Sequence, residues 1–575
     1  MASQQRIAPV TPDVNSSAIY GWERFGKRIA ILFVLIFGLA RAWVERFSLD
    51  ADGISYLDLS DAFTRRDWHN FLNAYWSPLY PILLGISRLV LPTSKRWELP
   101  SAHLLNFAIY AAALGCFEYF YAALRDSLVL RNASRDQSEE QSTFALIGEW
   151  PLWVLAHALF LWVSLDLITL WDVTPDMCVS ALVYVIAGLI LRFRQDSSWR
   201  RAAALGVVLG VSYWAKAVMF PLAFVFMAIA LLRAPNVKTA VKRGLVMAAI
   251  FAAVAGPLVA ALSIQKHRLT FGDSGPLAYA NLVSPGGASH DWQGEPALGI
   301  KAVHPVRKLL SDPPLYEFAQ PIGGTYPPFF DPTYWEEGRV ARFSLRAQVA
   351  TIGRHLLLYA ELLLHQNNAL VATVLTFLFV MGRGARRALS QNLPLFCMCG
   401  AALGLYMLVL AEYRYIGAYV AILWLGLLSP FRAPTHLRVM SGCLSCAVAL
   451  VLLITVADST ARSVREGGPY SAAQDIVVSD HLDAMGLHPG DRIGIVGGVG
   501  GYAARLSHAK VVAEVWDVPA FWRLSQEKRQ AVLLKFAETG AKMVLAPDPG
   551  PLLTPDSSWL KVDAQPLYLH MLQGP

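Results

Sequence analysis

Long apolar runs constrain this chain more than any other feature. A helix needs about 20 mostly apolar residues to cross a bilayer, and such runs recur from residue 27 to residue 457. Only 16% of the 575 residues are charged, whereas soluble proteins carry about 25%. The sequence therefore predicts a polytopic α-helical membrane protein. We expect eleven transmembrane helices, at residues 27–47, 102–124, 144–165, 176–194, 202–215, 217–233, 243–263, 356–381, 393–411, 415–430 and 438–457.

The short apolar segment 78–92 decides the orientation of these spans. It begins and ends with proline. If it lies in the membrane interface or re-enters, the basic clusters at 24–28, 125–135, 192–201, 233–243, 383–387 and 432–438 all fall on the N-terminal side. The positive-inside rule makes that side cytoplasmic. We therefore predict that 78–92 does not cross the membrane and that the C-terminus lies outside the cytoplasm. The membrane is most simply a bacterial inner (plasma) membrane.

The chain divides into three predicted parts. Residues 1–26 are polar and form a cytoplasmic tail, residues 27–457 form the transmembrane domain with external loops 48–101 and 264–355, and residues 458–575 form a small soluble α/β domain. In that last part GDRIGIVG, AKVVAEVW and AKMVLAPD are typical of short buried strands, separated by helical stretches around 501–507 and 519–539. The turn after the first strand fits G-x-G-x-x-A at 498–503. We interpret it as a strand–helix turn, because NAD is not expected outside the cytoplasm.

The acidic loop after the first span is the leading functional candidate. Charges at a membrane surface are costly to desolvate, so a cluster of them marks a functional site by default. The alternatives are structural. Asp52 precedes Gly53, which suits a turn or helix cap, and Asp58 and Asp61 are expected on a solvated helix face, with Arg65 four residues after Asp61. The loop holds four carboxylates, Asp50, Asp52, Asp58 and Asp61.

Further polar residues are predicted to face the same compartment. A hydroxyl that attacks a sugar–phosphate carbon needs a carboxylate base, and cations stabilise the phosphate that leaves. The structural alternatives are a helix start for Asp176 after Pro175, a snorkelling side chain for Lys216, and an interfacial anchor for Arg414. The candidates are Asp172 and Asp176 in the loop WDVTPD, Lys216 within the apolar stretch 202–233, Lys301 and Arg307 in the long loop, and Arg414 and Tyr415 at the tenth span.

Several short motifs occur in an order that resembles a known superfamily. DGISY stands at 52–56, SPLYP at 77–81, TPD at 174–176, GVVLGVSYWAK at 206–216 and an Arg-Tyr pair at 414–415. This pattern resembles the GT-C superfamily of polyprenyl-phosphate-sugar-dependent glycosyltransferases, which includes protein O-mannosyltransferases and lipid A aminoarabinose transferases. The resemblance covers most of residues 27–457, and the large loop after the seventh span and the soluble C-terminal domain match the same layout.

The resemblance implies an inverting glycosyltransferase that moves a monosaccharide from a polyprenyl-phosphate donor to a hydroxyl of a lipid, glycan or protein acceptor. Relatives carry a second acidic residue beside the catalytic aspartate, where this chain has Gly53. Whether Asp52 and Asp176 hold a Mg or Mn ion therefore stays open. The resemblance implies catalysis for Asp52, a second-loop acidic site for Asp176, and donor phosphate binding for Lys216, Arg414 and Tyr415. By charge and loop position we add Asp50 beside Asp52, Asp172 beside Asp176, and Arg307 and Lys301 as further phosphate ligands.

Two other classes of function remain as alternatives. A lipid or glycolipid transporter would be expected to show internal repeats and charges at mid-membrane, whereas the sequence shows no repeat and gathers its charges at one surface. A non-catalytic scaffold would recruit partners through the C-terminal domain. Binding of nucleic acid is not expected, because the basic clusters are a topology signal.

Overall fold

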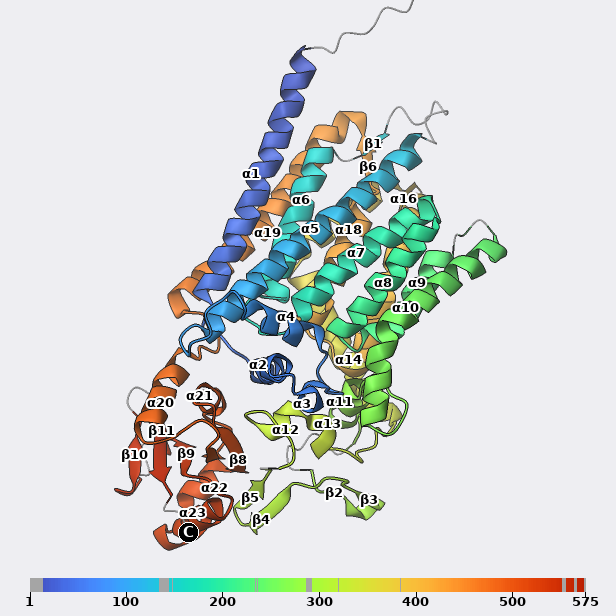
Figure 1. The fold of residues 1–575 in the computed structure, drawn as a ribbon. Helices are drawn as coiled ribbons and strands as arrows, with labels where there is room; N and C mark the ends of the chain where they lie inside the picture. The colour runs from blue at the N-terminus through green and yellow to red at the C-terminus, as the bar shows by residue number, and fades with distance from the viewer. Residues whose placement is uncertain are drawn as a thin grey trace, which may run out of the picture.

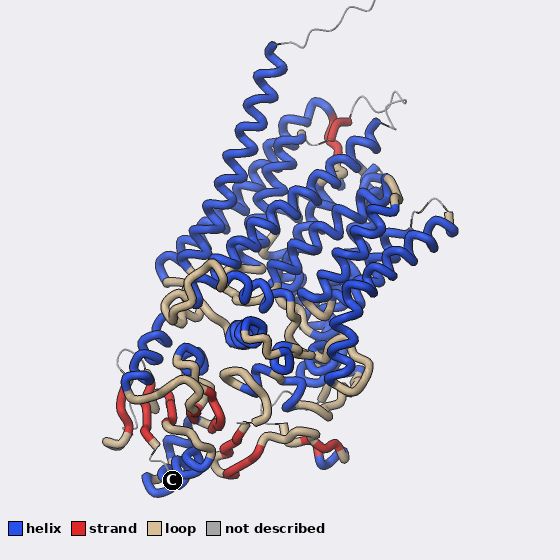
Figure 2. The backbone as a smooth tube through the Cα atoms, in the orientation of Figure 1, coloured by secondary structure: helices blue, strands red, loops and turns tan. Residues whose placement is uncertain are grey.

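A computed structural model gives the fold of this chain (Figures 1 and 2). The first half of the predicted N-terminal tail, residues 1–13, lies outside the described residues. From Val14 the chain is already helical, so the second half of that tail belongs to the first helix. The structure describes residues 14–133, 144–146, 148–232, 234, 236–285, 292–318, 320–382, 384–550, 555–562 and 566–572.

Long helices form a bundle, within which α5 packs on α7, α8 on α10 and α6 on α19 (Figure 1). A helix covers most of each of the eleven predicted runs. The helices of the bundle are α1 (Val14–Val44), α5 (Glu98–Ala133), α6 (Glu149–Trp162), α7 (Asp176–Gln195), α8 (Trp199–Ala215), α9 (Met219–Leu231), α10 (Val237–Gln265), α14 (Leu345–Ala360), α15 (Asn368–Met381), α17 (Leu393–Val409), α18 (Tyr413–Leu428) and α19 (Arg438–Glu466).

Helix length and hydropathy support an integral membrane protein. Among the described residues, six helices are long and apolar enough to cross a bilayer, or seven if the bent pair α14 and α15 counts as one span. The helices α9 and α18 are apolar but shorter. The total of eleven spans therefore stays a prediction.

The predicted span 356–381 is wrong as a single helix. Its two halves, α14 and α15, meet at a bend of 73°, with a π-helical turn at Glu361–His365 between them. Polar residues interrupt the apolar run here, and Asn367 donates a side-chain hydrogen bond of 2.5 Å to the Leu362 carbonyl. Helix α14 begins at Leu345, so the last part of the expected external loop 264–355 is helical.

Short helices lie between the bundle and a β-sheet (Figure 1). Within segment 78–92 the helix has nine residues, which rise about 14 Å, less than half of the roughly 30 Å hydrocarbon core. This length agrees with the prediction that the segment does not cross. The short helices are α2 (Ala51–Thr64), α3 (Trp68–Phe71), α4 (Leu79–Ser87), α11 (Ser274–Leu282), α12 (Pro327–Phe330) and α13 (Pro332–Trp335).

The C-terminal segment forms a mixed sheet whose central strands are the three predicted from sequence. Strand β7 (Arg492–Val496) pairs in parallel with β8 (Lys510–Val515) and β9 (Met543–Pro547). The helices α20 (Ala473–Ala484), α21 (Gly501–Leu506), α22 (Val518–Arg523) and α23 (Gln526–Glu538) accompany them. Two further strands, β10 (Trp559–Lys561) and β11 (Leu567–Met571), extend the sheet beyond β9.

The sheet also takes strands from the long loop, which the sequence did not indicate. The order of its seven described strands is β10-β11-β9-β7-β8-β5-β4. Strands β4 (Arg307–Ser311) and β5 (Pro314–Glu317) come from the loop after α10, and β5 pairs antiparallel with β8. The buried Leu315 of β5 joins the hydrophobic core on that side. The predicted domain 458–575 therefore shares its sheet with residues 307–317.

The remaining described elements are small. Strands β2 (Gly294–Glu295) and β3 (Ile300–Lys301) form a two-stranded ladder, and β1 (Phe144–Leu146) pairs with β6 (Arg432–Pro434). Helix α16 (Gly384–Leu389) precedes α17. In Figure 1 the start of α1 and the C-terminal sheet lie at opposite ends of the bundle, and the short helices gather at the sheet's end.

Candidate functional site

The start of α2 carries the two leading carboxylates. Asp50 is the N-cap, and its Oδ1 accepts the Gly53 amide at 3.1 Å. Asp52 lies in the first turn of the helix. The cap role considered for Asp52 thus belongs to Asp50, which leaves Asp52 free of that structural task. Gly53 permits close packing, because a Cβ there would come within 2.4 Å of Leu49 Cδ1.

Arg414 connects the carboxylates of three separate segments. Its Nη2 lies 3.1 Å from Asp52 Oδ2, and its Nη1 lies 3.6 Å from Asp50 Oδ2. Its Nε lies 2.7 Å from Glu412 Oε2 and 3.8 Å from Asp176 Oδ2. The guanidinium is thus surrounded by negative charge at the start of α18, which is a different environment from that of an interfacial anchor.

Lys216 lies at the break between α8 and α9, as the sequence predicted. It adopts an extended backbone conformation directly after Ala215, the last residue of α8. Its ammonium lies 2.5 Å from Asp176 Oδ1 and 3.4 Å above the ring centre of Tyr415. Thr174 donates to the other oxygen of Asp176 at 3.1 Å. Lys216 is therefore held by Asp176 and the Tyr415 ring, unlike a snorkelling side chain.

Several of these side chains line one cavity of about 300 Å³. Its polar wall is formed by Asp52, Asp176, Lys216, Arg414 and Tyr415. The rest of the lining is largely apolar, and we call this space the Asp52 cavity. The apolar and aromatic lining comes from α9, α17 and the segments before α4 and α11, and includes Trp76, Val218, Pro221, Phe271, Leu405 and Val409.

A second cavity, of about 630 Å³, opens on the other side of Arg414. Asp50, Asp172 and Glu412 line it together with Arg414, and we call it the Asp172 cavity. Burial, and then the neighbouring charge of Asp50, raises the pKa of Asp172 to about 8. Burial, and then the charge of Asp52, raises the pKa of Asp50 to about 7. Asp50 lines the Asp172 cavity and Asp52 lines the Asp52 cavity, although the two residues are only two positions apart.

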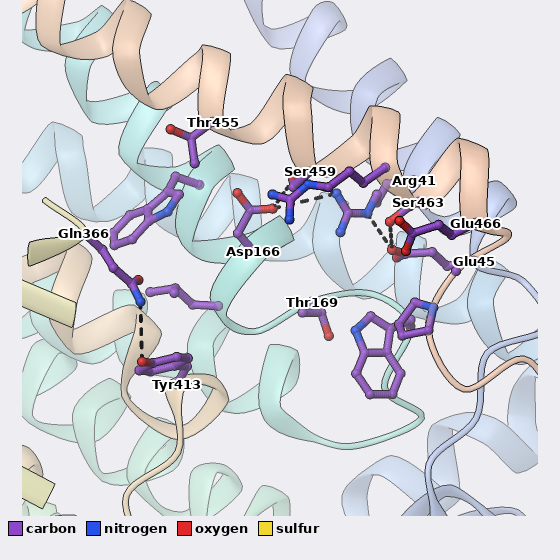
Figure 3. A pocket seen from close by; sticks show the side chains of 16 residues that line it. Arg41, Glu45, Asp166, Thr169, Gln366, Tyr413, Thr455, Ser459, Ser463 and Glu466 are labelled. Atoms are coloured by element: carbon purple, nitrogen blue, oxygen red, sulfur yellow. Dashed lines mark hydrogen bonds and ion pairs between the residues drawn. The ribbon is translucent and has the colours of Figure 1, made fainter. Parts of the chain in front are cut away.

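A third, polar pocket adjoins the Asp172 cavity through shared residues, among them Thr169, Trp171 and Tyr413 (Figure 3). In it the guanidinium of Arg41 bonds Glu45 at 2.7 Å and Ser459 at 3.0 Å. These contacts tie α1 to α19. None of the residues predicted for catalysis or donor binding lies in this pocket.

The site does not resemble a metal centre. Among the residues that the structure describes, no group of three or more His, Cys, Asp or Glu side chains is placed to hold a metal ion. Asp52 and Asp176, the predicted ligands, are instead paired with Arg414 and Lys216. We therefore derive no chemical step through a divalent cation.

Two predicted phosphate ligands lie elsewhere. Arg307 is in β4 of the C-terminal sheet, where its exposed side chain bonds Glu317 at 3.0 Å. Lys301 is an exposed residue of β3. Neither lines the Asp52 cavity, because the long loop runs into the sheet.

The prediction that Asp58 and Asp61 lie on a solvated helix face is wrong. Asp58 is buried, and its carboxylate is paired with the buried Arg505 of α21. Asp61 does pair with Arg65 at 3.5 Å, as the spacing suggests, but Arg505 lies closer, at 3.0 Å. Sequence spacing could not reveal this contact, because Arg505 lies more than 400 residues further along the chain.

Comparison with known proteins identifies the fold. No protein-family model matches the chain, and no curated protein matches it in sequence. ArnT from Cupriavidus metallidurans in the apo state, a lipid A aminoarabinose transferase, matches over 97% of this chain and 100% of its own, with 12% identity and a TM-score of 0.51. The chain has a GT-C fold.

Two further solved structures are similar to this chain. ArnT from Cupriavidus metallidurans bound to undecaprenyl phosphate shares 13% identity with a TM-score of 0.49, over 96% of this chain and 99% of that one. The Archaeoglobus fulgidus oligosaccharyltransferase tethered to an acceptor peptide shares 12% identity with a TM-score of 0.44, over 91% and 69%. The match to apo ArnT, at 12% identity, shows the fold alone.

Proposed function

We propose that this protein is an inverting glycosyltransferase that transfers a monosaccharide from a polyprenyl-phosphate donor to an acceptor hydroxyl. The observation that carries the proposal is the Asp52 cavity, which combines a carboxylate, two cations and an apolar lining. A base and a phosphate-binding pair in one cavity suit a reaction in which a hydroxyl displaces a phosphate.

The cavity suits a lipid-linked phosphate. Lys216 and Arg414 line the cavity together with apolar side chains of α9 and α17. A phosphate bound between Lys216 and Arg414 would replace Asp176 as the anion that is paired with these two cations. Charge-assisted hydrogen bonds of this kind are about twice as strong as neutral ones. The isoprenoid chain would then lie against the apolar lining.

The chemical step assigns one role to each group. Asp52 accepts the proton of the acceptor hydroxyl as its oxygen forms a bond to the anomeric carbon of the sugar. The bond from that carbon to the phosphate oxygen breaks, and polyprenyl phosphate leaves with the electron pair. Lys216 and Arg414 stabilise the negative charge that develops on the leaving phosphate. Attack opposite the leaving group inverts the anomeric centre.

Asp50 and Asp176 have supporting roles in this proposal. Asp50 caps α2 and lies 3.6 Å from Arg414, and Asp176 holds Lys216 at 2.5 Å. We place the site on the extracytoplasmic face, with the N-terminus in the cytoplasm, on the basic clusters of the sequence. The acceptor class, whether lipid, glycan or protein, is left to experiment.

The test is release of sugar by purified protein in lipid nanodiscs. A panel of radiolabelled undecaprenyl-phosphate monosaccharides is incubated with the protein and with mixed membrane-extract acceptors, in the presence and absence of chelator. The proposal predicts release from at least one donor. A protein that releases sugar from none, and does not bind undecaprenyl phosphate, would favour a transporter or a scaffold.

A further inference from the structure

We call the chain beyond residue 469 the C-terminal unit. It contacts α2, the helix that bears Asp52, on a face other than the one that carries Asp52. Asp52 and Tyr56 of α2 line the Asp52 cavity. The residues Ala51, Ile54, Ser55 and Asp58, spaced at three and four positions, lie on a second face of the helix. They line a separate cavity of about 330 Å³ against the glycine-rich turn after β7. Thus α2 lies between the site and the sheet.

Arg505 makes the main polar contact across this boundary. Its guanidinium lies 2.5 Å from Asp58 Oδ1, 3.0 Å from Asp61 Oδ2 and 2.7 Å from Glu98 Oε1. The side chain is only 4% exposed. Three carboxylates from α2 and the first turn of α5 thus share one arginine of α21. Arg88 completes the group by bonding Asp61 and, at 2.8 Å, Glu98.

Two arginines face the three carboxylates of this group, and burial still raises the pKa of Asp58. Burial alone would raise the pKa of Asp61, but Arg505 and Arg88 hold it below its ordinary value. Asp58 also accepts the amide and hydroxyl of Thr325 at 2.7 and 2.9 Å. Removing the arginine would leave buried carboxylates without their partner, which is costly in a protein interior.

The C-terminal unit also forms backbone hydrogen bonds with the chain immediately before Asp50. The Leu49 amide donates to the Tyr470 carbonyl at 3.2 Å, and the Ala472 amide donates to the Phe47 carbonyl at 2.7 Å. Ser48 and Ser471 form the bridge between these two bonds. Both the entry to α2 and its second face are therefore held by residues beyond 469.

We propose that Arg505 is a positioning residue for the reaction, and that the C-terminal unit holds α2 so that Asp52 meets Arg414 and the donor. This inference rests on the proposed function. Its physical basis is that catalysis depends on the placement of the reacting groups, and a displacement of about 1 Å can cost about 100-fold in rate. The ion pairs of Arg505 go to Asp58, Asp61 and Glu98, which do not line the Asp52 cavity.

The experiment compares Arg505→Gln with Arg529→Gln in the full-length protein in nanodiscs. Arg529 is a matched control, because among the described residues its contacts lie within the same C-terminal unit: the Trp522 ring, the Trp522 and Leu524 carbonyls, and Asp556. Two quantities are measured, the hydrogen exchange of the α2 backbone amides and the kinetics of sugar release.

Arg505→Gln is expected to speed α2 exchange by about tenfold and to lower kcat by about 10- to 100-fold. The donor KM should change less than about threefold, because Lys216 and Arg414 remain in place. Arg505→Lys should recover part of kcat by restoring the charge, and it keeps the test available if the glutamine variant does not fold. Arg529→Gln should leave α2 exchange and kcat as in the wild type.

Two results would overturn the inference. One is unchanged α2 exchange and kcat in Arg505→Gln, and the other is an equal loss in Arg529→Gln, which would indicate general loosening. Failure of the proposed function is a separate result, since it appears as wild-type protein that releases no more sugar than Asp52→Asn, while the exchange data still report whether Arg505 holds α2.

Discussion

Arg414 Nη2 and Asp52 Oδ2 lie 3.1 Å apart, although 362 positions separate the two residues in the chain. This pair joins the first turn of α2 to the start of α18 and places a carboxylate beside a cation in one cavity. The same guanidinium also lies within 4 Å of Asp50 and Asp176. Arg414 therefore determines where the acidic loops of this protein meet.

The first prediction concerns Lys216. Replacing it with Met keeps the apolar stem and removes the charge, so undecaprenyl phosphate should bind about 10- to 100-fold more weakly, the loss expected for a charged hydrogen bond of about 1.5–3 kcal/mol. The affinity is measured by titration in nanodiscs. Lys266→Met is the control, because Lys266 bonds the Thr333 carbonyl and does not line the Asp52 cavity. Equal affinities of the two variants would refute the assignment of Lys216.

A second prediction concerns the packing at Gly53. A Cβ at this position would lie 2.4 Å from Leu49 Cδ1 and 3.0 Å from Val173 Cβ. Gly53→Ala should therefore destabilise the protein by about 1–3 kcal/mol, as overpacking does, and displace the start of α2. Gly256→Ala in α10 is the control, since its Cβ would meet nothing within 4 Å. Thermal unfolding of both variants checks this, and a Gly53→Ala midpoint equal to that of Gly256→Ala would contradict it.

The third prediction concerns pH. Burial and then Asp50 raise the pKa of Asp172 from its ordinary value of 3.8 to about 8. The folded protein thus holds this proton more tightly than the unfolded chain does, so this stabilisation is complete below pH 3.8 and is lost as the pH rises through about 8. Between pH 5 and pH 9 the Tm of the wild type should fall more steeply than that of Asp172→Asn.

The control for this pH series is Asp458→Asn, which changes an exposed carboxylate of α19 and should keep the wild-type slope. Parallel slopes for Asp172→Asn and the wild type would show that Asp172 does not take up a proton on folding. The Tm of each protein is measured at several pH values at constant ionic strength.

Local sequence patterns predicted much of the fold. The apolar runs located the helices, and the break near Lys216 is predicted because two short segments fit the topology better than one long span. Strands β7, β8 and β9 were visible as short buried runs. The bend between α14 and α15 was missed, because the hydropathy of the run outweighed its few polar residues.

Contacts between distant segments were beyond the reach of one sequence. Strand β5 enters the C-terminal sheet through its pairing with β8, and no local pattern in the long loop reports that partner. For the same reason Lys301 and Arg307 were grouped with the site on charge alone. Asp52, Asp176, Lys216 and Arg414 were singled out by motif order, and the structure brings these four together.

The most direct test of the account is sugar release by Asp52→Asn. Radiolabelled undecaprenyl-phosphate monosaccharide is supplied to wild type, Asp52→Asn and Asp458→Asn in nanodiscs, and initial rates are measured at saturating donor. The account predicts that Asp52→Asn loses at least about 100-fold in rate, within the range for loss of a general base, while it still binds undecaprenyl phosphate and Asp458→Asn keeps the wild-type rate. A wild-type rate for Asp52→Asn would contradict it.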